Sequence, residues 1–255
     1  MILLETAVVA FGMFSALPMP RIDWNEKNMR YALCAFPLVG LAVGGASWAA
    51  AAVGGALGLP DLLQGAILCL LPVVITGGIH LDGFADTCDA LASHAPTEKK
   101  QEILKDPRLG CFAAIRLCCW FVACWALWAS LPRVNGPTVL LGYCFSRALS
   151  GLATVTLPMA KDTGLAHMFA EAADKRRAKR FLQVLCLALL AGLALCGPEG
   201  MAMALAALAV LWYYKKMSKK QFGGISGDLQ GWFLQMAELA MLAALFCAQW
   251  LEAMA

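Results

Sequence analysis

Long apolar stretches, separated by short connections, leave this chain few ways to fold. A helix needs roughly 20 consecutive apolar residues to cross the hydrocarbon core of a bilayer. The stretches that qualify are residues 31–57, 62–79, 111–131, 139–157, 181–196, 201–214 and 232–251. A water-soluble fold would expose too much apolar surface, because 61% of the residues are hydrophobic and only 15% are charged. We therefore expect an all-α polytopic bundle of about seven transmembrane helices, with residues 1–255 forming a single integral membrane domain.

The N-terminal residues 1–17 form a further apolar run, which carries Glu5 near its start and is closed by Pro18 and Pro20. The run has no basic segment in front of it and no Ala-x-Ala cleavage site, and both features argue against a signal peptide that is removed. We expect a retained helix. It either spans the membrane or lies half-buried at the interface.

Basic residues gather in alternate connections between the apolar stretches. The basic clusters lie within residues 21–30, 99–108, 175–180 and 215–220. The connections between these clusters hold a single cation, Arg133. By the positive-inside rule, all four basic clusters are expected on the cytoplasmic side of the membrane.

Three carboxylates follow the second apolar stretch directly, in the run His-Leu-Asp-Gly-Phe-Ala-Asp-Thr-Cys-Asp at residues 80–89. If a helix continues through this run at about 100° per residue, Asp82, Asp86 and Asp89 fall within a narrow arc on one face. Like charges at one spot repel each other unless a cation lies among them, and carboxylate oxygens suit Mg²⁺, Mn²⁺ or Ca²⁺. The alternative is a solvated acidic helix end. The apolar context favours a metal site on the cytoplasmic side.

A second motif occupies residues 103–110, in the same cytoplasmic connection, and reads Ile-Leu-Lys-Asp-Pro-Arg-Leu-Gly. It places a fourth carboxylate, Asp106, beside Lys105 and Arg108. Lys and Arg at the end of a span commonly serve as interfacial anchors. Close to a metal site, the same two cations could neutralise a diphosphate.

A third motif, the glycine-rich run at residues 222–231, opens the last apolar stretch. Its glycines would let backbone N–H groups approach a phosphate at a helix N-terminus. The residues concerned are Gly223, Gly224 and Gly227. Asp228 would complete a metal or nucleotide site, or Asp228 or Ser226 would cap the last helix.

Two arginines lie inside apolar stretches, where a charge costs several kcal/mol unless it is paired or hydrated. Arg116 lies about one and a half turns into the third stretch, and Arg147 lies near the middle of the fourth. We expect both side chains to face the interior of the bundle. Each either pairs with a structural partner or contacts a substrate phosphate. Glu238, inside the last stretch, is the expected carboxylate partner within the bilayer.

The three motifs closely resemble those of the cobalamin synthase family, the adenosylcobinamide-GDP ribazoletransferases. The resemblance extends over the whole chain and rests on residues 77–89, 105–110 and 223–228. It implies a multi-pass enzyme of the bacterial inner membrane whose active site faces the cytoplasm. Such an enzyme joins adenosylcobinamide-GDP to α-ribazole or its 5′-phosphate with Mg²⁺ as cofactor, and it releases GMP. Departures from the family pattern at Ala90, Ala113 and Ser226 affect no charged group.

The family chemistry suggests roles for the motif residues. The residues expected to hold Mg²⁺ are Asp82, Asp86, Asp89, Asp106 and Asp228. The proton of the attacking hydroxyl would pass to an Asp or to His80. The residues expected to contact substrate are Lys105, Arg108, Arg116, Arg147, Gly223, Gly224 and Gly227.

Two other functions are weighed against this one. A CDP-alcohol phosphotransferase also strings Asp residues at helical spacing, but its motif has Arg after Ala where this chain has Asp86. A cation transporter would place its charges near the middle of the bilayer and break helices in matching halves. We expect small-molecule substrates and the lipid bilayer as partners and no nucleic acid, and the sequence leaves open whether a second copy of the chain is a further partner.

Overall fold

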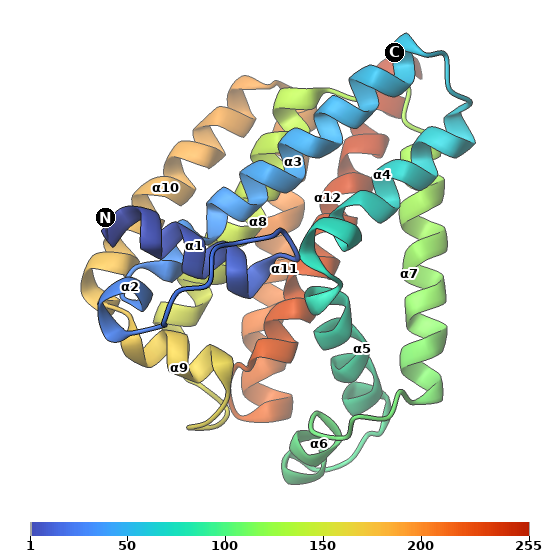
Figure 1. Cartoon of the computed structure of the whole chain (residues 1–255). Helices are drawn as coiled ribbons and strands as arrows, with labels where there is room; N and C mark the ends of the chain where they lie inside the picture. The colour runs from blue at the N-terminus through green and yellow to red at the C-terminus, as the bar shows by residue number, and fades with distance from the viewer. Residues whose placement is uncertain (1, 255) are drawn as a thin grey trace.

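The computed structural model describes residues 2–254, and within them all regular secondary structure is helical apart from one β-bridge, between Met159 and Ile225. The helices are α1 (Ile2–Phe14), α2 (Glu26–Met29), α3 (Ala32–Ala56), α4 (Asp61–Thr76), α5 (Ile79–Ala92), α6 (Thr97–Ile103), α7 (Cys111–Ala129), α8 (Gly136–Thr156), α9 (Leu165–Ala172), α10 (Lys175–Leu195), α11 (Pro198–Phe222) and α12 (Gly227–Met254). The expected all-α bundle is confirmed (Figure 1).

Side chains and prolines of the connections determine where several helices begin. Asn135 accepts a hydrogen bond from the backbone N–H of Thr138 and starts α8, which has Pro137 in its first turn. Asp174 accepts from the backbone N–H of Arg177 and starts α10. Because of this cap, α10 includes the basic cluster at residues 175–180, so the helix begins before the apolar stretch does.

α8 is the central helix of the bundle, and most of its residues are buried. α3 packs closely against it because two glycines of α3 face the α8 backbone. A Cβ added at Gly40 would lie 2.5 Å from the carbonyl oxygen of Tyr143, and one added at Gly44 would lie 2.7 Å from the Cα of Leu140. Small residues at such crossings allow backbones to touch, which is how helices gain van der Waals contact in lipid.

Five helices are long and apolar enough to cross a membrane, or six if the bent pair α4 and α5 counts as one span. These five or six candidate spans are consistent with the expected polytopic bundle of about seven. The difference is α11, which has 25 residues and is long enough to cross at 1.5 Å per residue. Its C-terminal part carries Lys215, Lys216, Lys219 and Lys220, so no continuous segment of it is as apolar as the membrane-spanning segments of the five helices.

The apolar stretch 62–79 does not continue straight into the acidic motif. Gly77 and Gly78 have φ angles of +65° and +76°, in the left-handed region that favours glycine. The chain bends there by 96° between α4 and α5. The Asp-rich run is helical, as expected, but it belongs to a separate helix that points in a new direction.

The N-terminal helix α1 has 13 residues, which corresponds to roughly 20 Å of helix. A bilayer core is about 30 Å thick, so this helix is too short to span it. Phe14, at its end, packs on Phe36 of α3 with 4.1 Å between the ring centroids. Of the two alternatives for this segment, the structure favours the half-buried one.

The basic clusters gather at one end of the bundle, together with α2, α6 and α9 (Figure 1). The turn between α3 and α4 and the C-terminal end of α12 lie at the other end. α10 and α7 form opposite sides of the molecule, with α11 and α12 between them. The alternation of basic and nearly uncharged connections along the sequence therefore gives the folded bundle one basic end and one end with few cations.

Candidate functional site

The three sequence motifs meet at one cavity of about 430 Å³ at the basic end of the bundle. α5, α12 and the loop between α8 and α9 line its polar side, whereas α1 and α3 contribute apolar residues. The predicted site residues that line it are His80, Asp82, Lys105, Gly227 and Asp228. Segments that lie far apart in the sequence thus contribute to a single cavity.

Two glycines bring the first and third motifs into contact. A Cβ added at Gly83 of α5 would lie 2.7 Å from the Cα and the carbonyl oxygen of Asp228. A Cβ added at Gly231 of α12 would lie 2.6 Å from the carbonyl oxygen of His80. No side chain fits between the two helices at this crossing, so the backbones touch. This contact holds Asp228 beside the acidic face of α5.

The three carboxylates of α5 share one face, as predicted. From His80 to Ala90, the residues that are not buried are Asp82, Asp86 and Asp89. Asp82, Asp228 and Asp89 all lie close enough to Asp86 to act on its carboxylate electrostatically. The face is therefore strongly electronegative.

Asp89 has a defined structural partner. Its Oδ2 accepts a hydrogen bond of 2.7 Å from the backbone N–H of Gly110, and its Oδ1 accepts one of 2.8 Å from that of Ala113. The carboxylate thereby caps the N-terminus of α7, where backbone N–H groups lack partners within the helix and the helix dipole favours a negative charge. The structure thus assigns Asp89 to the junction of α5 and α7, and its metal role stays a prediction without structural support.

We expect Asp89→Ala to lower the free energy of unfolding by about 1–2 kcal/mol, because two N–H groups at the start of α7 lose their acceptor. Asp89→Asn should lower the free energy of unfolding by a smaller amount, since the asparagine keeps one acceptor oxygen. Thermal unfolding in detergent measures both effects. An Asp89→Ala protein with unchanged stability would show that the cap contributes nothing.

The glycine-rich loop is held by its own backbone. Gly223 ends α11 with a φ of +78°. A Cβ on Gly224 would lie 2.6 Å from the backbone nitrogen of Ala160. Ile225 donates its N–H to the carbonyl of Pro158 (2.9 Å), and Ala160 donates to the carbonyl of Ile225 (2.8 Å). The loop is thus joined to residues 158–160, and substrate contacts by Gly223 and Gly224 stay predictions.

The cap of α12 is Ser226, one of the two residues that the sequence left open for this role. Its Oγ accepts a hydrogen bond of 3.3 Å from the backbone N–H of Leu229. The carboxylate of Asp228 lies 3.4 Å from the same hydroxyl. Asp228 therefore does not cap the helix, and its carboxylate lies on the cavity wall.

The cavity also includes polar residues that the sequence analysis missed. These residues are Thr154, Lys161, Thr163, His167 and Gln230. Four of them come from the end of α8, from α9 and from the loop between these helices, where no motif marks them. Gln230 lies inside the glycine-rich run and donates a 2.8 Å hydrogen bond to Thr154.

Lys161 is the missed residue that carries a charge. Its Nζ donates a hydrogen bond of 2.7 Å to the carbonyl oxygen of Gln101. Partial burial, followed by the nearby charge of Lys105, lowers the pKa of Lys161, and the carboxylate of Asp228 opposes this effect. Two ammonium groups and the acidic face therefore influence each other across the same cavity.

Asp106, Arg108 and Arg116 are among the predicted site residues that do not line the cavity. Arg108 hydrogen-bonds the carboxylate of Asp106 through Nε (2.9 Å) and Nη2 (2.8 Å), and these bonds hold the pKa of Asp106 at about 2. Neither residue lines the cavity. Arg116 is exposed on α7, so the expectation that it faces the interior was wrong. The sequence showed how deep Arg116 lies in the span, but it did not show which face of α7 is packed.

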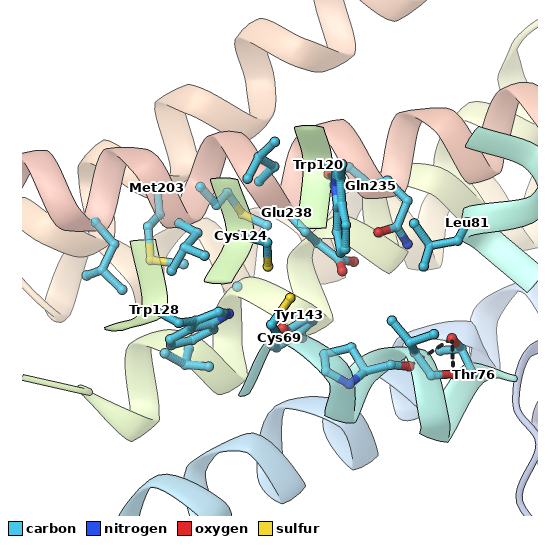
Figure 2. A pocket seen from close by; sticks show the side chains of 18 of the residues that line it. Cys69, Thr76, Leu81, Trp120, Cys124, Trp128, Tyr143, Met203, Gln235 and Glu238 are labelled. Carbon is cyan, nitrogen blue, oxygen red and sulfur yellow. Dashed lines mark hydrogen bonds between the residues drawn. The ribbon is translucent and has the colours of Figure 1, made fainter. Parts of the chain in front are cut away.

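Arg147 does face the interior, and its partner is Glu238, as predicted. Ser146 donates to Glu238 (3.1 Å), and Arg147 donates to the hydroxyl of Ser146 (2.9 Å). Figure 2 shows Glu238 beside Cys124 and Tyr143, around an internal cavity of about 40 Å³. Arg147 lines this internal cavity and not the larger one, so its predicted contact with substrate has no structural support.

Within residues 2–254, no three His, Cys, Asp or Glu side chains come together as a preformed metal cage. Mg²⁺ is commonly held by one or two carboxylates, with substrate phosphates and water completing its coordination. Asp82, Asp86 and Asp228 are hard oxygen donors around one electronegative face, and Asp82 and Asp228 line the cavity. This donor set fits a Mg²⁺ ion that binds together with a phosphate group.

Comparison with known proteins gives consistent matches over nearly the full length. The family model described as cobalamin-5-phosphate synthase matches residues 6–246. A curated protein from Lachnoclostridium phytofermentans, named adenosylcobinamide-GDP ribazoletransferase, is 38% identical over 96% of this chain and 95% of its own. A protein with the same name from Geobacillus kaustophilus is 32% identical over 92% of this chain and 92% of its own. Another from Treponema denticola is 32% identical over 94% of this chain and 96% of its own. No solved structure gives a significant match.

Proposed function

The chain belongs to the cobalamin-5-phosphate synthase family, and we propose that it joins adenosylcobinamide-GDP to α-ribazole or its 5′-phosphate with release of GMP. It is a transferase of cobalamin biosynthesis, as its curated relatives are. The observation that carries the residue roles is the meeting of all three motifs at one cavity. An acidic face opposite two lysines is the arrangement expected for a diphosphate that binds with a divalent cation.

In this proposal Asp82, Asp86 and Asp228 hold Mg²⁺. When bound, the ion neutralises charge on the diphosphate oxygens and on the leaving phosphate. Asp89 and Asp106 are left out of this set, because the first caps α7 and the second pairs with Arg108. The contacts between α5 and α12 at Gly83 and Gly231 keep the carboxylates at a fixed spacing.

Lys105 lines the same cavity and would contact a phosphate oxygen of the substrate. The attacking ribose hydroxyl must lose a proton, which passes either to a carboxylate that does not hold the ion or to His80. His80 lines the cavity, is 5% exposed, and has a buried Nδ1 without a hydrogen-bond partner in the described structure. An unpartnered ring nitrogen on a residue that lines the cavity supports His80 as a candidate for this step.

The proposed orientation follows from the polarity of the bundle. The basic end, which holds the cavity, would face the cytoplasm of a bacterial cell, and the apolar helices would cross the inner membrane several times. Nucleotide substrates and Mg²⁺ are available on that side. Association with a second copy of the chain stays a prediction.

The direct test uses the purified protein in detergent or liposomes with adenosylcobinamide-GDP and α-ribazole. We expect GMP and the corrinoid product to form together in the presence of MgCl₂ and to be absent when EDTA replaces it. Turnover that persists in EDTA would refute the metal requirement but not the transfer reaction. If a folded preparation releases no GMP, the transfer reaction itself is refuted, and CDP-alcohol substrates become the next candidates.

A further inference from the structure

One lysine that lines the cavity, Lys161, belongs to none of the three sequence motifs. Lys161 belongs to the loop between α8 and α9 and lines the cavity together with Lys105, Asp82 and Asp228. Its electrostatic neighbours include both Lys105 and Asp228. The cavity therefore has two ammonium groups, those of Lys105 and Lys161, in addition to the carboxylates of α5 and α12.

The loop of Lys161 is held in place by two segments of the chain, the glycine-rich run and α6. The β-bridge between Met159 and Ile225 joins the loop to the glycine-rich run. Gln101 of α6 donates from its side-chain nitrogen to the carbonyl oxygens of Phe222 (2.8 Å) and Ala160 (3.4 Å). The same Gln101 accepts the hydrogen bond from the Lys161 ammonium through its own carbonyl. The ammonium is thereby positioned before any ligand binds.

An ammonium group has three N–H donors, and Lys161 uses one of them on Gln101 among the hydrogen bonds of the described residues. Two like charges at one cavity are unfavourable unless an anion lies near both. A carboxylate face and two lysines that share a cavity can bind a diphosphate through its metal on one side and its oxygens on the other.

We propose that Lys161, together with Lys105, binds the diphosphate of the substrate at this cavity. The inference rests on the proposed function only for the identity of the natural ligand, since inorganic pyrophosphate presents the same oxygens. It assigns Lys161 to substrate binding in place of Arg108, which is exposed and paired with Asp106. Lys161 is expected to act on binding of the nucleotide substrate and not on that of the acceptor.

The first test measures binding of pyrophosphate to the full-length protein in detergent, with MgCl₂ present, by calorimetry. Loss of a charge-assisted hydrogen bond should weaken binding about 10- to 100-fold in Lys161→Gln, and Lys161→Arg should recover most of the affinity. Lys179→Gln, at an exposed lysine of α10, is the matched control and should bind like the unaltered protein. Unchanged affinity in Lys161→Gln, or no binding by the unaltered protein, would overturn the proposal.

A purely structural role for Lys161 makes a different prediction. Gln101→Ala removes the side chain that anchors the loop but keeps the ammonium and the carbonyl that it contacts. If Lys161 only anchors the loop, Gln101→Ala should weaken pyrophosphate binding as much as Lys161→Gln does. We expect a smaller loss. In turnover assays, Lys161→Gln should raise the KM for adenosylcobinamide-GDP at least about tenfold and leave the KM for α-ribazole unchanged.

A measurement on the unaltered protein avoids any folding defect of the variants. Pyrophosphate should protect Lys161 and Lys105 from an amine-acetylating reagent, as read by mass spectrometry, whereas Lys179 should react at the same rate with and without it. Equal labelling of Lys161 in both conditions would refute the proposal. If pyrophosphate protects Lys161 but the protein releases no GMP from adenosylcobinamide-GDP, the anion site stands and the proposed function fails.

Discussion

Asp82→Asn is expected to reduce GMP release about a thousandfold, with the protein still folded. A bound metal ion contributes several kcal/mol of charge stabilisation, and each 1.36 kcal/mol corresponds to a factor of about ten in rate. Asp82 is exposed on the acidic face of α5 and lines the cavity, so the substitution removes a charge without disturbing packing. The measurement is the initial rate of GMP release as a function of MgCl₂ concentration.

Asp162→Asn is the matched control for this variant. Asp162 is an exposed carboxylate on the loop beside Lys161, and it does not line the cavity. It should keep the rate and the MgCl₂ dependence of the unaltered protein. Equal rates for Asp82→Asn and the unaltered protein at all MgCl₂ concentrations would exclude Asp82 as a metal ligand. A loss in Asp82→Asn that high MgCl₂ partly restores would specifically support metal binding.

The second large effect is expected at the buried ion pair. Glu238→Leu should lower the free energy of unfolding by about 3–5 kcal/mol, because it leaves the charge of Arg147 without its partner inside the bundle. The side chain of Arg147 is 1% exposed and that of Glu238 is 10% exposed, so the guanidinium would lose its charged partner at a site with little access to bulk solvent. The measurement is denaturant or thermal unfolding in one fixed detergent.

The double variant Arg147→Met/Glu238→Leu tests the cause of this loss. If the unpaired charge is responsible, the double variant should recover most of the stability that Glu238→Leu loses. Glu252→Gln serves as the control on the same helix, since Glu252 pairs with Arg133 at the surface and such pairs contribute at most about 1 kcal/mol. A double variant as unstable as Glu238→Leu would show that packing, and not charge, accounts for the effect.

These two experiments separate the functions of the two cavities. The larger cavity, at the basic end, is expected to control turnover, and the smaller one, around Glu238, is expected to control stability. The sequence left two alternatives for Arg147, a structural ion pair and a contact with a substrate phosphate. The structure assigns it to stability because its guanidinium is enclosed by Tyr143, Ser146 and Glu238.

The acidic motif illustrates how far periodicity can predict a site. A step of about 100° per residue was enough to place Asp82, Asp86 and Asp89 on one face, since all three belong to one helix. The same argument could not show that Asp89 caps α7, because its partners Gly110 and Ala113 lie in another helix. The glycine pair at residues 77 and 78 could suggest a break, but it could not give the direction of the bend.

The sequence by itself determined the helical membrane bundle, the alternation of charge between its ends, and the three motifs. These features depend on local composition and on helical period, which act over a few residues. Only the tertiary structure showed that Lys161 lines the cavity, that the side chain of Arg116 is exposed on the surface of α7, and that Arg147 forms a buried ion pair with Glu238. Those outcomes depend on which faces of distant helices pack together, as at Gly83 and Gly231, and no local pattern encodes such a contact.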